Sequence, residues 1–150
     1  MNAFDSVVLC GGATERRGLP TKGADAKGVV QAMTFLTQQT KVVWGESVQD
    51  QIVATGKDVI VIGGGDTGSD CVGTSNRQGA KSVTNFEIMP KPPVGRSEST
   101  PWPYWPLQLK TSSSHEEGCN RNWLINTKEF ITNDKGELTA LKTVEVEWKI

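Results

Sequence analysis

The residues best suited to chemistry in this chain are glycines that follow a short apolar stretch. Gly63, Gly65 and Gly68 form a Gly-x-Gly-x-x-Gly pattern directly after residues 59–62, which are all β-branched. In dinucleotide-binding units, the first glycine makes a tight turn and the second lets the backbone approach a pyrophosphate. The third lets the following helix pack closely on the strand. We therefore expect a pyrophosphate at a helix N-terminus, where free N–H groups and the helix dipole favour an anion.

The expected pyrophosphate contacts come mostly from backbone N–H groups in one uninterrupted run. Asp66 is expected to cap the helix or bond to backbone rather than touch phosphate, because two anions repel each other. A Gly-rich turn with a purely structural role is the alternative interpretation of the same run. The predicted cofactor-binding set is Gly63, Gly64, Gly65, Asp66, Thr67 and Gly68.

The sequence around the glycines favours a nucleotide-binding unit over an isolated turn. Residues 66–78 can form a helix of about three turns, and Gly79 provides a C-terminal stop. Residues 82–89 read as a second strand, which Pro90 ends. Glu87 lies about 20 residues past the glycines, where such folds place an acidic ligand of the ribose.

The rest of the pattern predicts an α/β fold: a Rossmann-like dinucleotide-binding domain with a parallel central sheet, helices and an additional antiparallel β layer. A chain of 150 residues suits a single domain. Asn133 to Gly136 supply hairpin turn chemistry between the last two predicted strands. The further predicted elements are a buried strand at 6–10, a helix at 28–39, a short helix at 49–55, a helix start at 112–117, and strands at 123–131 and 138–148.

Composition excludes several classes of partner. The formal net charge is −1, which implies no basic face and argues against nucleic acid. There is no long apolar stretch and no signal peptide, so we expect a cytoplasmic protein that does not enter a membrane. Cys10, Cys71 and Cys119 are too far apart for a CxxC pair or a metal cluster, so we expect buried or half-buried thiols and no metal site.

Longer motifs resemble those of a known family, the small (β) subunit of glutamate synthase. The resemblance covers nearly all of the chain and is far more specific than the glycines alone. It is carried by residues 8–14, 19–20, 28–29, 32–36, 63–77, 86–90, 102–106 and 111–118.

The resemblance implies a pyridine-nucleotide domain inserted within an FAD-binding domain. In that family the small subunit passes hydride from NADPH to FAD, and iron–sulfur clusters carry electrons to FMN in the large subunit. There, 2-oxoglutarate and glutamine-derived ammonia become glutamate. This chain has one Gly-x-Gly-x-x-Gly and no cysteine array, so FAD and iron–sulfur clusters are expected only in the full-length subunit.

By this reading, residues 1–150 are a single NAD(P)H-binding domain excised from a larger FAD-containing subunit. Residues 1–14 would include a crossover strand from the flavin domain, with Gly11 and Gly12 near the nicotinamide–flavin junction. No side chain here can accept a hydride, so we assign no catalytic residue and expect the isolated chain to be inactive. The expected partners are the pyridine nucleotide, the FAD domain and the glutamate synthase large subunit.

Selection of NADPH over NADH requires a cation near the adenosine 2′-phosphate. Lys91 and Arg96, after the second strand, are the candidates, and Arg96 could make bidentate contacts. Glu87 argues for NADH, because a carboxylate suits a free 2′-hydroxyl, unless its side chain points away. We favour NADPH, chiefly on the resemblance, and NADH stays possible.

Two further features leave alternatives open. His115, the only histidine, could be a base or a polar residue at a helix start. Trp102, Tyr104 and Trp105 could stack on a nicotinamide, cover an adjoining domain or form a hydrophobic plug. The competing function for the whole chain is a non-catalytic module that uses a nucleotide-binding fold for protein assembly.

Overall fold

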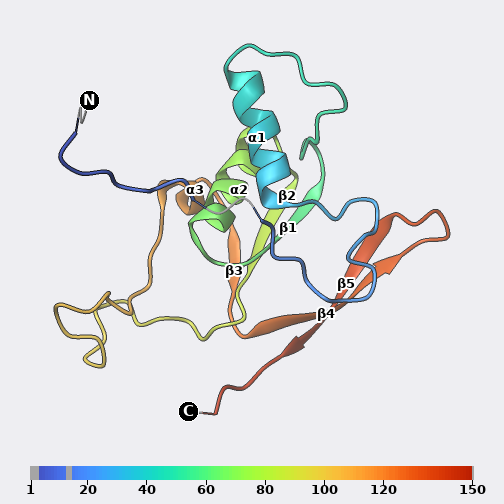
Figure 1. The fold of residues 1–150 in the computed structure, drawn as a ribbon. Helices are drawn as coiled ribbons and strands as arrows, with labels where there is room; N and C mark the ends of the chain where they lie inside the picture. The colour runs from blue at the N-terminus through green and yellow to red at the C-terminus, as the bar shows by residue number, and fades with distance from the viewer. Residues whose placement is uncertain (1–3, 13–14, 150) are drawn as a thin grey trace.

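The centre of the computed structural model, which describes residues 4–12 and 15–149, is a parallel sheet of three strands (Figure 1). The strands are β1 (Asp58–Ile62), β2 (Ser82–Phe86) and β3 (Asn120–Asn122), in the order β1-β2-β3. β1 and β2 confirm the two strands predicted on either side of the glycine-rich turn, although β2 ends three residues earlier than expected. β3 was not predicted, because three polar residues carry no strand pattern.

Helix α2 (Asp66–Arg77) joins β1 to β2 and packs on both strands. Its approach to β1 depends on Gly68, because a Cβ there would collide with the carbonyl oxygen of Gly63. The helix buries Val72 completely and ends at Gln78, followed by Gly79 with a φ of 79°. The predicted helix, its glycine stop and the packing role of Gly68 are confirmed.

Helix α1 (Ala32–Val43) packs on α2. The sequence predicted a helix at 28–39, whose apolar positions Val29, Ala32, Met33 and Leu36 have the spacing of one buried face. The helix instead starts four residues later, Met33 is exposed, and Phe35 is the buried residue. The start is delayed because the backbone at Lys27 is held by the C-terminal hairpin, where Leu138 N–H donates to the Lys27 carbonyl at 2.8 Å.

The second sheet is an antiparallel hairpin of β4 (Ile125–Thr132) and β5 (Leu138–Glu145). Its turn is built by Asn133, whose side-chain oxygen accepts the N–H groups of Lys135 and Glu137 at 3.0 and 2.9 Å. The predicted hairpin is confirmed, with both strands shorter than expected.

The predicted helix at 49–55 is wrong, because this segment has no helical turn. Its N–H groups are taken by glutamine side chains from elsewhere in the chain. Ile52 N–H donates to the side-chain oxygen of Gln38, and Ala54 N–H donates to that of Gln78, both at 2.8 Å. Hydrogen bonds of this kind replace those a helix would make internally.

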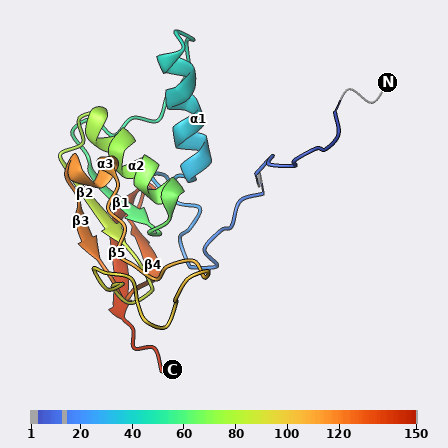
Figure 2. The same cartoon turned by 90° about the vertical axis from the view of Figure 1, so that its left-hand side faces the viewer.

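The predicted buried strand at 6–10 is also wrong. Val7, Val8 and Leu9 are 78%, 82% and 93% exposed, and the segment runs away from the body of the molecule (Figure 2). A strand needs a partner for its backbone groups, and no described strand lies beside this segment. Cys10 is exposed for the same reason, whereas Cys71 is buried and Cys119 half-buried, as expected.

One face of β1 is less covered than its continuous apolar run suggested. Val61 faces α2 and is buried, but Ile60 and Ile62 remain 44% and 40% exposed. α1 packs chiefly on α2 rather than on the sheet. The three helices therefore leave the opposite face of β1 accessible among the described residues.

Candidate functional site

The predicted phosphate loop lies where β1 runs into α2, at the carboxyl edge of the parallel sheet. Gly63 has a φ of 115°, a conformation that favours glycine, and its N–H donates to the Phe86 carbonyl at 2.8 Å. Gly65 is the N-cap of α2 and is exposed. No described atom lies within 4 Å of a Cβ built on Gly65, so the approach to the helix N-terminus is open.

The first turn of α2 carries Asp66 and Thr67, both exposed. The prediction that Asp66 caps the helix is wrong, because Gly65 holds the cap position and no side chain makes a capping bond. Asp66 is instead the first helical residue, where its charge interacts favourably with the helix dipole. The N–H groups of this turn lack acceptors within the helix, which leaves them available to a ligand.

Glu87 joins the phosphate loop to the second strand. One carboxylate oxygen accepts the Gly64 N–H at 2.8 Å, and the other accepts the Met89 N–H at 3.1 Å. A Cβ on Gly64 would collide with this carboxylate. The structure therefore brings Glu87 to the loop and gives it a contact that orients the loop backbone, and its role as a ribose ligand stays a prediction.

Asn85 is a site residue that sequence reasoning missed. It is 2% exposed, and its amide donates to the carbonyls of Val61 and Gly63 at 3.1 and 2.8 Å. These bonds fix the end of β1 and the first glycine of the loop. The available signal was a polar residue inside an apolar strand, but its partners depend on the register that pairs Val61 with Asn85.

The two cations proposed for the 2′-phosphate are not brought together. Arg96 holds its own loop, donating from Nε to the Thr100 carbonyl at 2.8 Å and from a terminal nitrogen to the Tyr104 carbonyl at 2.6 Å. Lys91 Nζ lies 4.9 Å from the centre of the Trp123 ring. Lys91 is therefore placed beside the sheet, and Arg96 within the proline-rich loop.

The remaining predicted cofactor residues, Gly11 and Gly12, lie in the exposed N-terminal segment. No described atom lies within 4 Å of a Cβ built on either glycine. The structure does not bring them to the phosphate loop.

His115 belongs to a helix start. In α3 (Ser113–Glu116), the side chain of the N-cap Ser112 accepts the His115 N–H, and His115 Nδ1 accepts the Ser112 N–H at 3.3 Å. Ser112 also hydrogen-bonds Ser69 and so ties α3 to α2. Burial, and then the charge of Arg121, lower the pKa of His115. This reciprocal cap supports the structural reading of His115 over that of a base.

The aromatic residues of the proline-rich loop do not form a buried plug. Trp102, Tyr104 and Trp105 are 83%, 68% and 78% exposed. Lys110 Nζ lies 4.0 Å from the centre of the Trp105 ring. The plug interpretation is wrong for the described structure, because a hydrophobic plug would bury these rings.

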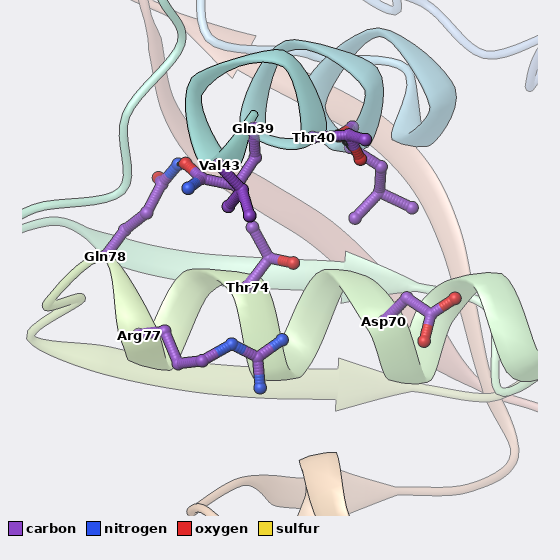
Figure 3. A pocket seen from close by; sticks show the side chains of 8 residues that line it. Gln39, Thr40, Val43, Asp70, Thr74, Arg77 and Gln78 are labelled. Atoms are coloured by element: carbon purple, nitrogen blue, oxygen red, sulfur yellow. Dashed lines mark hydrogen bonds between the residues drawn. The ribbon is translucent and has the colours of Figure 1, made fainter. Parts of the chain in front are cut away.

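A cavity of about 410 Å³ lies between α1 and the C-terminal half of α2 (Figure 3). Gln39 and Gln78 close one side of it through an amide hydrogen bond of 2.6 Å, and Arg77 and Asp70 lie along α2. The phosphate loop is at the opposite end of α2. The cavity is therefore separate from the candidate site.

No protein-family model matches the chain, but known proteins of similar sequence exist. It is 51% identical over 148 residues to the glutamate synthase [NADPH] small chain of Mycobacterium tuberculosis, covering 95% of this chain and 30% of that protein. It is 42% identical over 152 residues to the Bacillus subtilis small chain, covering 96% and 31%. The chain is homologous to one segment of the glutamate synthase small chain.

Relatives named for the other nucleotide are also similar. The chain is 46% identical over 157 residues to the glutamate synthase [NADH] of Saccharomyces cerevisiae, covering 99% of this chain and 7% of that protein. The chain therefore spans less than a third of the length of these glutamate synthase relatives. The two bacterial relatives are named for NADPH and the yeast relative for NADH.

A solved structure supports the fold class. The chain matches a ferredoxin reductase from Rhodopseudomonas palustris with a TM-score of 0.52 and 17% identity, covering 85% of this chain and 28% of that one. This likeness concerns the fold alone. The described residues thus form an α/β, Rossmann-like fold with an added antiparallel layer. No helix in the part of the chain that the structure describes is long and apolar enough to cross a membrane.

Proposed function

We propose that this chain is the NAD(P)H-binding domain of a glutamate synthase-type flavin oxidoreductase. It would position NADPH for hydride transfer to FAD, in support of glutamate synthesis from glutamine and 2-oxoglutarate. The observation that carries the proposal is the open glycine loop at the carboxyl edge of β1, which leads into the N-terminus of α2. The homology to glutamate synthase small chains supports it.

The residues of the loop fit a pyrophosphate. Gly63 makes the turn, Gly65 leaves its side of the loop open, and the first turn of α2 presents N–H groups. Gly64 already donates its N–H to Glu87, so Gly65, Asp66 and Thr67 would offer the available backbone donors. The nicotinamide supplies the hydride when bound, and this chain binds and orients it.

Further parts of the proposal concern the protein beyond this segment. FAD and iron–sulfur clusters would belong to other parts of the full-length subunit, and the large subunit would be its partner. Residues 1–150 would form one domain of that subunit, with the segment that begins it crossing from the flavin domain. The exposed apolar side chains of Val7, Val8 and Leu9 support this, since they are suited to burial against another domain.

The test is the variant Gly65→Val, titrated with NADPH and NADH by calorimetry. A Cβ at Gly65 meets no described atom within 4 Å, so the fold and its thermal unfolding midpoint are expected to be retained. The side chain would occupy the space that a pyrophosphate needs, so dinucleotide affinity should fall at least about a hundredfold.

Gly18→Val is the matched control, because a Cβ there also meets nothing within 4 Å. It should bind nucleotide like the unaltered chain. Equal affinities of the two variants would contradict the phosphate-loop assignment. If the unaltered chain bound neither nucleotide, the proposal would fail and the assembly-module alternative would be favoured.

A further inference from the structure

Two cations share one aromatic ring next to the candidate site. Lys91 Nζ lies 4.9 Å from the centre of the Trp123 ring, and the guanidinium carbon of Arg121 lies 5.1 Å from the same point. Lys91 follows β2 and is exposed, whereas Arg121 is in β3 and half-buried. The ring therefore gathers positive charge from two segments that are far apart in the sequence.

The cluster lies at the same sheet edge as the phosphate loop. β2 and β3 are parallel, with Phe86 paired to Asn122, and their hydrogen bonding continues past the strand ends. Glu87 N–H donates to the Asn122 carbonyl at 2.8 Å, and Leu124 N–H donates to the Met89 carbonyl at 3.3 Å. Trp123 thus follows β3 beside Glu87, the residue expected near the ribose of a bound dinucleotide.

The charge of this cluster is not neutralised within the described part of the chain. Neither Lys91 nor Arg121 forms an ion pair with a described carboxylate. One terminal nitrogen of Arg121 donates to the Lys110 carbonyl at 3.0 Å, but its Nε is buried without a described acceptor. A buried donor without an acceptor is costly, and an anion could supply one.

Arg96 is less suited to bind an anion. Its Nε and one terminal nitrogen donate to carbonyls of its own loop, which fixes the guanidinium there. Arg121 keeps a donor free and lies in a strand next to β2. The two cations lie 4.9 and 5.1 Å from the same ring centre, which places positive charge from both side chains next to a phosphate bound beside Trp123.

We propose that Arg121 and Lys91, held by Trp123, recognise the 2′-phosphate of NADPH and determine the preference for NADPH over NADH. The inference rests on the proposed function, because it needs a dinucleotide whose pyrophosphate lies at the glycine loop. In this proposal the arginine that binds the 2′-phosphate is Arg121 in β3, which lies 25 positions after Arg96 in the chain.

The test uses two probes that differ only by the phosphate in question, adenosine 2′,5′-bisphosphate and adenosine 5′-monophosphate. Calorimetry at fixed salt gives the ratio of their affinities for the unaltered chain, Arg121→Gln, Lys91→Gln and Arg96→Gln. Lys41→Gln is the control for charge, because Lys41 is an exposed residue in the last turn of α1. We expect Arg121→Gln and Lys91→Gln each to weaken the bisphosphate about tenfold or more, as loss of a charge-assisted hydrogen bond does.

Binding of the monophosphate should change by less than about twofold in both variants, because the 5′-phosphate lies at the loop rather than at Trp123. Arg121→Lys, which keeps the charge, should recover part of the ratio. Equal weakening of both probes by Arg121→Gln would show that Arg121 only supports the fold. If only Arg96→Gln lost the preference for the bisphosphate over the monophosphate, the 2′-phosphate would be assigned to Arg96 instead.

Two outcomes separate this inference from the proposed function. If the unaltered chain bound both probes equally while Gly65→Val abolished binding, the nucleotide-binding function would stand and the 2′-phosphate site would be overturned. If the unaltered chain bound neither probe nor dinucleotide, both proposals would fail. Lys91→Gln keeps the inference testable should Arg121→Gln not fold, because Lys91 is exposed.

Discussion

At the scale of single residues, the phosphate loop is held in shape by side chains from β2 rather than by its own sequence. Asn85 ties the carbonyls at the end of β1, and Glu87 ties the N–H of Gly64. A glycine-rich loop is flexible when unsupported, because glycine restricts the backbone least. These two neighbours therefore reduce the conformational freedom that binding would otherwise remove.

Replacing Asn85 with leucine tests this support. The buried carbonyl of Val61 and the half-buried carbonyl of Gly63 would lose their side-chain donor, which should lower the free energy of unfolding by about 1–3 kcal/mol in urea titrations. The dinucleotide should also bind more weakly. Asn120→Leu, at an exposed position of β3, is the control. An Asn85 variant as stable as that control would show that the two bonds contribute nothing.

The sequence identified the loop glycines and Glu87 because their pattern is local and known. It did not identify Asn85 or Arg121, since their contacts arise from the register of parallel strands that lie far apart in the chain. It offered Lys91 and Arg96 as candidates for the 2′-phosphate because both follow the second strand and because arginine can bind a phosphate through two nitrogens. The hydrogen bonds that hold Arg96 in its loop depend on how residues 97–107 fold back on it.

At the scale of elements, α3 is too short to be stable by itself and is held by its cap. Ser112 and His115 satisfy each other's backbone N–H groups, and Ser112 also bonds Ser69 on α2. The hydroxyl pattern predicted a helix start here. The capping partner is His115 rather than an acid, which makes the cap sensitive to pH.

Protonation of His115 should destabilise this cap. Burial lowers the pKa of His115, so the folded state favours the neutral ring, whose Nδ1 accepts the Ser112 N–H. The stabilisation is therefore present above about pH 6.5, the pKa of an unperturbed histidine. It is lost as the pH falls through that value towards the lower pKa of the folded state.

Thermal unfolding between pH 7.5 and 5.5 measures this effect, in a range above the titration of most carboxylates. The midpoint should fall with pH in the unaltered chain and fall less in His115→Gln, which cannot titrate. A parallel fall in both proteins would assign the pH dependence to other groups.

At the scale of the whole molecule, the elements were more predictable than their burial. Local periodicity indicated α2 and the two hairpin strands, because each pattern lies within one segment. The buried strand predicted at 6–10 placed Val8 in the core, yet Val8 is exposed, and so is Ile60 in the apolar run of β1. Exposed apolar side chains of this kind are suited to burial against another surface, which the local sequence pattern does not specify.

The segment before α1 contacts the C-terminal hairpin through isolated β-bridges, so that two distant parts of the chain lie side by side (Figure 1). Lys22 pairs with Glu129 and Lys27 with Glu137, but the two lysine side chains are 84% and 78% exposed, so the ion pairs contribute little. The close contact is at Gly23, where the backbone lies against Phe130 with a φ of 79°. The absence of a side chain at Gly23 thus allows the two segments to meet.

Replacing Gly23 with alanine should separate this segment from the hairpin. The new Cβ would collide with the Phe130 carbonyl in a backbone conformation that alanine disfavours, so we expect a loss of about 1–3 kcal/mol in urea titrations. Proteolysis within residues 15–30 should accelerate as the segment opens. Gly18→Ala, where a Cβ has open space, should change neither measurement.

Raising the salt concentration should affect the unaltered chain only slightly, because exposed ion pairs are screened and weak. If Gly23→Ala were as stable and as resistant to proteolysis as Gly18→Ala, the contact between residues 15–30 and the β4–β5 hairpin would have to depend on its ion pairs. Raising the salt concentration would then separate the two segments.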